Sequence, residues 1–212
     1  MKKQLIFLLM LATCHLTAAT ATGEPDFTVP EGKAVIFFTR DFSLNVTAKI
    51  TLFDGDKLIM RFTEPGYIRY VCEPGQHLFW AVSAMNYRIL TDIRPGKIYY
   101  MKITPTDLKM TAFSLFRTTF VIQYKKNKHD KHQIELMIKA LRKRKLLKPD
   151  PKEMEKARKM YAGKIKKTMQ KYKKYIHKKH TLYMFKYLGE KSREREFTPE
   201  EFMTVLQEMG KS

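Results

Sequence analysis

The stretch "AKITLFDGDKLIMRF", residues 48–62, decides the fold class of this chain. Apolar and polar residues alternate on both sides of Asp54-Gly55, as they do in strands that bury one face. Glycine accepts the positive φ that a tight two-residue turn requires, so the pattern predicts a β-hairpin. A sheet with antiparallel strands is therefore expected here.

Strand and turn signals continue from about residue 33 to residue 124. The run "AVIFF" (34–38) is typical of a strand that is buried on both faces. Pro-Gly pairs at 65–66, 74–75 and 95–96 each separate strand-like runs, because proline pre-sets φ and glycine allows the chain to reverse. About seven short strands at this spacing predict an antiparallel β-sandwich, with Trp80 in its core.

Four segments of this region resemble a known family. They are "GKAVIFFTR" (32–40), "LFDGDKLI" (52–59), "EPGYIRYVCEPGQHLF" (64–79) and "RPGKIYYMKI" (94–103). Over about residues 31–104 the chain resembles bacterial exported or lipoprotein-type domains of unknown function, similar to PEGA and carboxypeptidase-regulatory-like β-sandwiches. The resemblance implies an envelope location and an accessory fold, and it carries no catalytic residues.

A helical period replaces the strand pattern from about residue 127. The apolar residues spaced three and four apart are Ile134, Met137, Ile138 and Leu141. Next, "DPKE" (150–153) supplies an N-cap, a proline at the first helical position and an acid, so a second helix is expected from there to about Leu188. "TPEE" (198–201) begins a third helix. We expect the three apolar stripes to bury one another as a small bundle.

These patterns predict an α+β chain, with an N-terminal antiparallel β-sandwich followed by a basic C-terminal region of two or three amphipathic helices. The predicted segments are a signal peptide at 1–21, a β-sandwich domain at 26–124 and a basic α-helical region at 127–212.

Positive charge is concentrated in the helical region. Residues 125–195 hold 26 Lys or Arg against seven Asp or Glu, which is +19 of the chain's net +20. "KIKKTMQKYKKYIHKKH" (164–180) holds eight lysines and no acid. Like charges one helical turn apart repel each other, so this run favours an anion-binding face over a merely solvated one, and both interpretations stay open. The anion-binding candidates are Arg142, Lys143, Arg144, Lys145, Lys166, Lys167, Lys173, Lys174, Lys178 and Lys179.

The first residues have the three parts of a secretory signal: Lys2 and Lys3, an apolar run at 5–12, and "ATA" at 19–21. One interpretation is cleavage after residue 21. The other is that "LATC" (11–14) resembles a bacterial lipobox, which makes Cys14 a lipidation candidate, although Thr13 departs from the usual small residue. Either cleavage predicts an exported protein, periplasmic or membrane-anchored as a lipoprotein. Either also leaves Cys72 without an intramolecular partner, so a buried thiol is expected there.

Signals of catalysis are poor. The sequence has no Gly-x-Ser-x-Gly, P-loop, dinucleotide fingerprint or Cys-x-x-Cys. The histidine pairs 129/132 and 177/180 lack a third ligand, so no metal or cofactor is expected. His77 follows a turn and is expected to be a hydrogen-bonded structural residue.

These observations favour a non-catalytic bacterial envelope protein whose cationic helices bind an anionic membrane surface, or an acidic envelope polymer or protein. Two alternatives stay open: an enzyme of unrecognised type, and a structural component that forms oligomers through its helical stripe. Nucleic acid is the least expected partner, because the chain is predicted to be exported and its tyrosines fall on the apolar stripe, where they cannot stack on bases.

Overall fold

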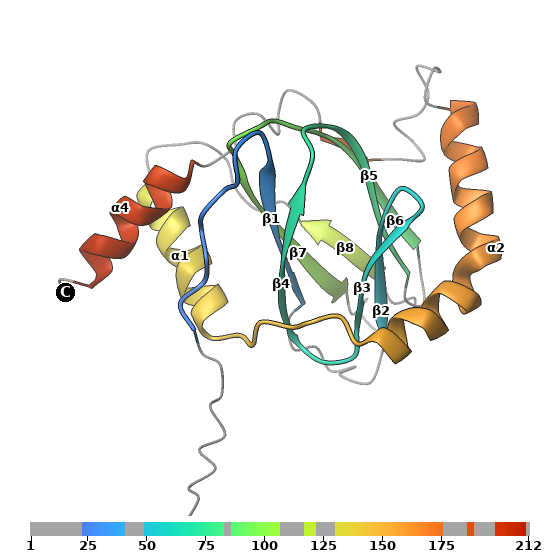
Figure 1. Cartoon of the computed structure of the whole chain (residues 1–212), viewed down its shortest axis with the longest axis horizontal. Coiled ribbons are helices and arrows are strands. Elements are labelled where there is room, and N and C mark those ends of the chain that lie inside the picture. The colour runs from blue at the N-terminus through green and yellow to red at the C-terminus, as the bar shows by residue number, and fades with distance from the viewer. Residues whose placement is uncertain are drawn as a thin grey trace, which may run out of the picture.

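Two β-sheets lie face to face, and helices cover both outer faces (Figure 1). The computed structural model describes residues 23–40, 49–82, 86–106, 117–121, 130–175, 186–188 and 198–210. Within this part of the chain the layers are helix, sheet, sheet, helix.

Sheet A has the strand order β4-β1-β7-β8, and sheet B has the order β3-β2-β5-β6-β9. The strands of sheet A are β1 (Ala34–Arg40), β4 (Gly66–Cys72), β7 (Ile98–Thr106) and β8 (Arg117–Val121). The strands of sheet B are β2 (Ile50–Asp54), β3 (Lys57–Phe62), β5 (Gly75–Val82), β6 (Asn86–Ile93) and β9 (Lys186–Leu188). Most neighbours are antiparallel, but β1 runs parallel to β7 and β6 parallel to β9, so both sheets are mixed.

The expected hairpin at Asp54-Gly55 is confirmed. Strands β2 and β3 pair antiparallel, with Asp54 opposite Lys57, and Gly55 has φ of 57°. Glycine adopts this left-handed backbone at no steric cost, which is why the tight turn forms here.

The strands are apolar on both faces, and this decides where the helices go. Successive side chains of a strand point to opposite faces. In β1, Ile36 and Phe38 point into the core between the sheets, whereas Val35 and Phe37 point outward. Cys72 lies in the inter-sheet core with a buried thiol, as expected. Both sheets therefore need cover on their outer faces.

Helices α1 (Asp130–Arg142) and α4 (Pro199–Met209) cover the outer face of sheet A. The expected stripe of α1 is buried there, with Val35, Phe37 and Tyr100 of the sheet. Phe27, from the segment before β1, stacks on Phe202 of α4 with ring centroids 4.5 Å apart. The capping box at Thr198 and Glu201 starts α4 as the sequence predicts.

Helix α2 (Pro151–Tyr175) covers the outer face of sheet B, on the opposite side of the sandwich (Figure 1). The expectation that all three helices bury one another is wrong, because the stripe of α2 packs on strands and not on α1 or α4. Trp80, expected in the core, lies between sheet B and α2 with no exposed area. The sandwich segment (26–124) and the helical segment (127–212) therefore share hydrophobic cores.

The chain crosses between the two helical layers along the edge of sheet A. Lys145 accepts a hydrogen bond at its carbonyl from Tyr67 N (3.0 Å), and Leu147 N donates to Tyr67 O (2.8 Å). The crossing segment thus pairs with β4 like a short additional strand, and the Leu147 side chain enters the inter-sheet core.

The α+β class, with N-terminal sheets and C-terminal helices, is confirmed. The second helix was expected to reach Leu188, and this is wrong, because Lys186–Leu188 forms β9 beside β6. Strand β6 would otherwise leave one edge of backbone donors and acceptors unpaired, and an extended segment satisfies them where a helix cannot.

Candidate anion-binding surface

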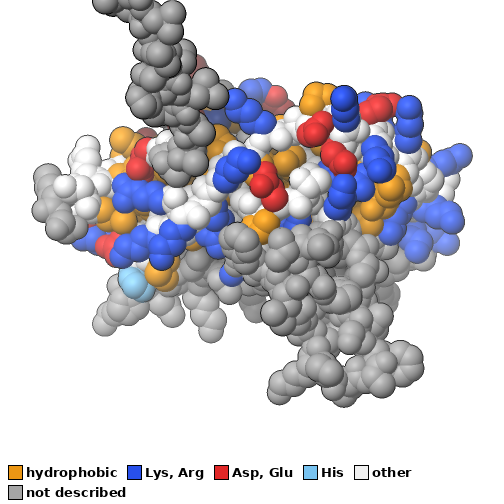
Figure 2. Space-filling view, turned by 90° about the horizontal axis from the view of Figure 1, so that it is seen from below, with side chains coloured by type: hydrophobic (Ala, Val, Ile, Leu, Met, Phe, Trp, Pro, Cys, Tyr) orange, Lys and Arg blue, Asp and Glu red, His pale blue; other side chains and the backbone are white. Residues whose placement is uncertain are grey.

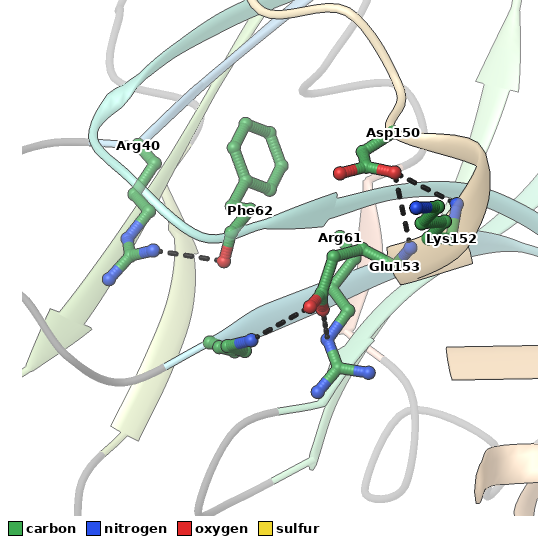
Figure 3. Close-up of polar contacts among 7 residues, drawn as sticks. Arg40, Arg61, Phe62, Asp150, Lys152 and Glu153 are labelled. Carbon is green, nitrogen blue, oxygen red and sulfur yellow. Dashed lines mark hydrogen bonds and ion pairs between the residues drawn. The ribbon is translucent and has the colours of Figure 1, made fainter. Parts of the chain in front are cut away.

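Helix α2 begins where the sequence predicts and is held there by polar contacts (Figure 3). Asp150 caps it, since its carboxylate accepts hydrogen bonds from Lys152 N (2.8 Å) and Glu153 N (3.4 Å). Glu153 then reaches back to sheet B, where it pairs with Lys49 Nζ (3.1 Å) and Arg61 Nε (3.2 Å). The hydrogen bond from Lys49, with the Arg61 guanidinium nearby, lowers the pKa of Glu153 and keeps it ionised.

Two arginines are buried close to this junction. Arg61 is only 7% exposed, and its partner Glu153 supplies the compensating charge. Arg40, at the end of β1, has no exposed area and donates from Nη1 to Phe62 O (3.0 Å). Burial lowers the pKa of Arg40. The Arg61–Glu153 pair fixes the first turn of α2 against sheet B, and the Arg40 bond ties β1 to the end of β3.

The apolar stripe of α2 packs against the outer face of sheet B. The stripe residues packed there are Met154, Ala157, Tyr161, Ile165, Met169 and Tyr172. Ala157 is fully buried, and Tyr161 meets Phe53 edge-on with ring centroids 6.0 Å apart. Tyr172 OH donates to Gln76 Oε1 (3.0 Å). Between Met154 and Tyr172 the stripe is therefore covered by sheet B of the same chain.

The rest of α2 faces solvent and is strongly cationic. The helix holds ten Lys or Arg against two Glu, a net charge of +8. Glu155 pairs with Lys159 (3.3 Å) and lies 3.5 Å from Arg158, and no Asp or Glu follows within the helix. In Figure 2, Lys and Arg side chains crowd the right-hand edge, the side on which Figure 1 places α2. We call the cations of α2 from Lys156 to Lys174, all exposed except the half-buried Lys164, the α2 cationic face.

The structure separates the predicted anion-binding residues into two groups. Lys166, Lys167, Lys173 and Lys174 are exposed members of the α2 cationic face. The residues at 142–145 lie at the end of α1 and in the crossing segment, within the other helical layer. There, Arg142 pairs with Glu24 (2.9 Å) and Lys145 with Glu64 (3.0 Å), Arg144 donates to Ala140 O, and Lys143 is exposed. Cys14, Lys178 and Lys179 lie outside the described residues.

Sequence reasoning missed several members of this face. They are Lys156, Arg158 and Lys159, which precede the run 164–180, whereas Lys164 and Lys171 belong to that run without being among the named candidates. A signal was present, because Lys152, Lys159, Lys166 and Lys173 recur every seven residues. Seven residues are about two helical turns, so this spacing keeps the four lysines on one side of the helix.

A polar cluster joins the two sheets at the hairpin turn. Asp54 accepts hydrogen bonds from Tyr70 OH (3.0 Å, sheet A) and His77 Nδ1 (2.7 Å, sheet B), while His77 Nε2 lies 2.8 Å from Glu73 O. His77 is therefore the hydrogen-bonded structural residue that the sequence predicts. Burial raises the pKa of Cys72 to about 12, so this nearby thiol is not a thiolate nucleophile at neutral pH.

His77 should make the stability of the fold depend on pH. Both ring nitrogens face acceptors, so the imidazolium satisfies both and the neutral ring only one. Burial lowers the pKa of His77, but the Asp54 hydrogen bond and charge outweigh it, and the net pKa is raised. The stabilisation is thus full below the unfolded value near 6.5 and is lost as pH rises through the folded value.

We expect urea unfolding to show a stability difference between wild type and His77→Gln that shrinks from pH 5 to pH 8. The exposed His132 serves as the control, and His132→Gln should leave the pH profile unchanged. A difference that stays constant or grows with pH would contradict this role of His77.

One pocket lies between the sandwich and α2. It has a volume of about 420 Å³ and lies between β3, the crossing segment and the first turn of α2. Its lining includes three Lys or Arg and three Asp or Glu, which are Arg61, Lys145, Lys148, Glu64, Asp150 and Glu153. The pairs Arg61–Glu153 and Lys145–Glu64 leave little net charge to attract a ligand. The lining contains no Ser or Cys, the usual catalytic nucleophiles, and no His, the usual catalytic base.

No described helix has the length and hydrophobicity of a membrane span. Within the described ranges, no three His, Cys, Asp or Glu side chains gather as metal ligands would.

Comparisons with known proteins add little to this geometry. No protein-family model and no curated protein matches the chain. One similar solved structure is a "putative cell adhesion protein" from Bacteroides ovatus, with 9% sequence identity and a TM-score of 0.23. The similarity covers 44% of this chain and 46% of that one, so the chain spans less than half of that protein's length. A similarity at this score supports no conclusion about the fold. The assignment of a sandwich follows from the two sheets of this structure.

Proposed function

We propose that this chain is a non-catalytic protein of the bacterial cell envelope, which binds an anionic envelope surface or partner through the α2 cationic face. The observation that carries the proposal is the difference in charge between α2 and the two helices on the opposite face of the sandwich. Helix α2 has a net charge of +8, whereas α1 and α4 together hold three Lys or Arg against five Asp or Glu. Solubility alone gives no reason to concentrate this much positive charge on one helix.

The energetics suit a surface-binding role. Near an anionic lipid surface each Lys or Arg contributes about 1 kcal/mol, so five engaged cations give a dissociation constant of about 10⁻⁴ M. That affinity is weak for a free protein but sufficient beside a lipid anchor, because stable attachment requires two signals. A lipidated Cys14 would supply the second.

Two sequence features support the envelope location. The first is the signal-like N-terminus, and the second is the resemblance of residues 31–104 to PEGA-like domains of exported proteins and lipoproteins. Mass analysis of the mature N-terminus after cell fractionation tests this part. Cleavage after Ala21 or lipidation at Cys14 supports the proposal, whereas an uncleaved cytosolic product contradicts it.

Removing two cations from the α2 cationic face should weaken binding about 30-fold. The variant Lys166→Gln/Lys173→Gln takes both from the seven-residue row and loses about 1 kcal/mol for each. The measurement is co-sedimentation with vesicles rich in phosphatidylglycerol and retention on a column of an acidic polymer, each over a range of salt concentrations. Wild-type binding should fall steeply with salt.

The matched control is Lys139→Gln/Lys143→Gln, which removes the same charge from the end of α1. It should change affinity less than twofold on both probes. Equal weakening by the two variants would show that net charge alone is responsible. Failure of the wild-type protein to bind either probe at low salt would refute an anion-binding role.

A further inference from the structure

The middle of the α2 cationic face contains a glycine that the fold does not explain. Gly163 is exposed, and apart from the backbone of its own helix and its two chain neighbours no described atom lies within 4 Å of the position that its Cβ would occupy. Its φ is not positive, unlike that of Gly32, Gly55, Gly75 and Gly96. Glycine inside a helix is less favourable than alanine, so neither packing nor backbone conformation requires it here.

The missing side chain leaves a notch in the cationic face. On a helix, residues three and four positions away are surface neighbours. For Gly163 these are Lys159 and Met160 on one side and Lys166 and Lys167 on the other. The notch therefore has bare backbone as its floor and cations on both sides. Glycine at such a place is typical of sites where a ligand approaches the backbone closely.

The cations around the notch do not lie in one plane. At about 100° per residue, the lysines from Lys156 to Lys174 spread over about 180° of the helix circumference. A flat bilayer can touch only the crest of such a cylinder, whereas a flexible chain can bend over it and meet both flanks. The apolar stripe of α2 is packed on sheet B, so the helix cannot add insertion into lipid.

The chemistry of the cations favours a hydrated acidic chain. Nine of the ten cations of α2 are lysines, compact and strongly hydrated charges that act as point charges and do not require a bidentate partner. Single-stranded nucleic acid needs aromatic rings on which its bases stack. Tyr161 and Tyr172 pack against sheet B, and the Tyr161 ring also has Lys164 Nζ 6.0 Å from its centroid, so neither ring is free to stack on a base.

We propose that the partner of the α2 cationic face is an acidic polysaccharide, whose chain crosses the helix at Gly163 between Lys159 and Lys167. This inference rests on the proposed anion-binding function and names the class of its ligand. The lysines on both sides of the notch neutralise carboxylates on successive parts of the chain, and the glycine lets the chain pass close to the helix backbone.

A neutral side chain in the notch tests the crossing point. Gly163→Gln keeps every charge and should favour the helix, yet it should weaken binding of a polyuronate oligomer about tenfold, measured by titration calorimetry at fixed salt. Ala162→Gln places the same side chain about 100° around the helix, at the edge of the cations, and should change affinity less than twofold. Gly163→Ala should raise Tm by about 2–4 °C, which verifies that the helix tolerates substitution.

Three further ligands separate the alternatives: phosphatidylglycerol vesicles, polyphosphate and duplex DNA. We expect the polyuronate to bind more tightly than any of them, and Gly163→Gln to leave vesicle binding within twofold of wild type. Unchanged polyuronate binding by Gly163→Gln overturns the crossing at Gly163, and tighter binding of vesicles, polyphosphate or DNA overturns the polysaccharide. In both cases the anion-binding function stands, whereas no binding of any ligand refutes the function itself.

Discussion

Trp80→Ala should lower the free energy of unfolding by about 3–5 kcal/mol, the usual cost of truncating a large buried aromatic side chain. Trp80 has no exposed area and stacks on Phe53 with ring centroids 4.0 Å apart. Its Nε1 also donates to Gly55 O (2.6 Å) at the tip of the hairpin. The substitution removes the packing under α2 and leaves that carbonyl without its partner.

Urea unfolding measures the loss, and hydrogen exchange locates it. Amides of α2 should lose protection first, because Trp80 lies directly beneath this helix. Trp80→Phe serves as the control, since it keeps a ring against Phe53 and loses mainly the hydrogen bond to Gly55, worth about 1 kcal/mol. A loss below about 1 kcal/mol for Trp80→Ala would show that α2 does not depend on this contact.

Gly66→Ala should cost about 3–4 kcal/mol, although it adds one methyl group. A Cβ at this position would lie 2.6 Å from Leu147 Cγ and 2.8 Å from Lys145 O. The crossing segment must then move away from β4, which breaks its two hydrogen bonds with Tyr67, each worth about 1 kcal/mol. Partial exposure of Leu147, otherwise in the inter-sheet core, supplies the remainder of about 1–2 kcal/mol.

The control for this prediction is Gly23→Ala, a glycine with nothing within 4 Å of its Cβ position. It should leave the urea midpoint within error of wild type. If Gly66→Ala is equally harmless, the crossing segment is not tied to β4 as described.

Local patterns in the sequence were sufficient for the turns and the helix starts. Asp54-Gly55, Asp150 and the Thr198–Glu201 box each act through neighbours within four residues, so their residue types predict the geometry directly. Gly66 shows the limit. Its Pro-Gly pair predicts a turn, yet the close approach of Leu147, 81 positions later, is what makes glycine necessary.

The position of the helices could not be predicted for a related reason. Periodicity shows that α2 has an apolar face, but it does not show which surface covers that face. In the structure the apolar face of α2 packs on outward-facing residues of sheet B, such as Phe53 and Trp80, and not on the other helices. The cationic run was visible in the sequence, whereas its separation from the cations at 142–145 depends on which side of the sandwich each helix covers.

The unequal charges of α2 and of the α1–α4 side have a consequence for how the molecule approaches a partner. Helix α2 carries +8, whereas α1 and α4 carry −2 together and three further cations lie beside α1 at 143–145. The protein therefore has a permanent electric dipole that points from the α1–α4 side towards α2. In the field of an anionic surface such a dipole turns before contact, which speeds productive encounters. The docked molecule would then always present its α1–α4 side outward, so that every copy offers the same face to whatever lies beyond.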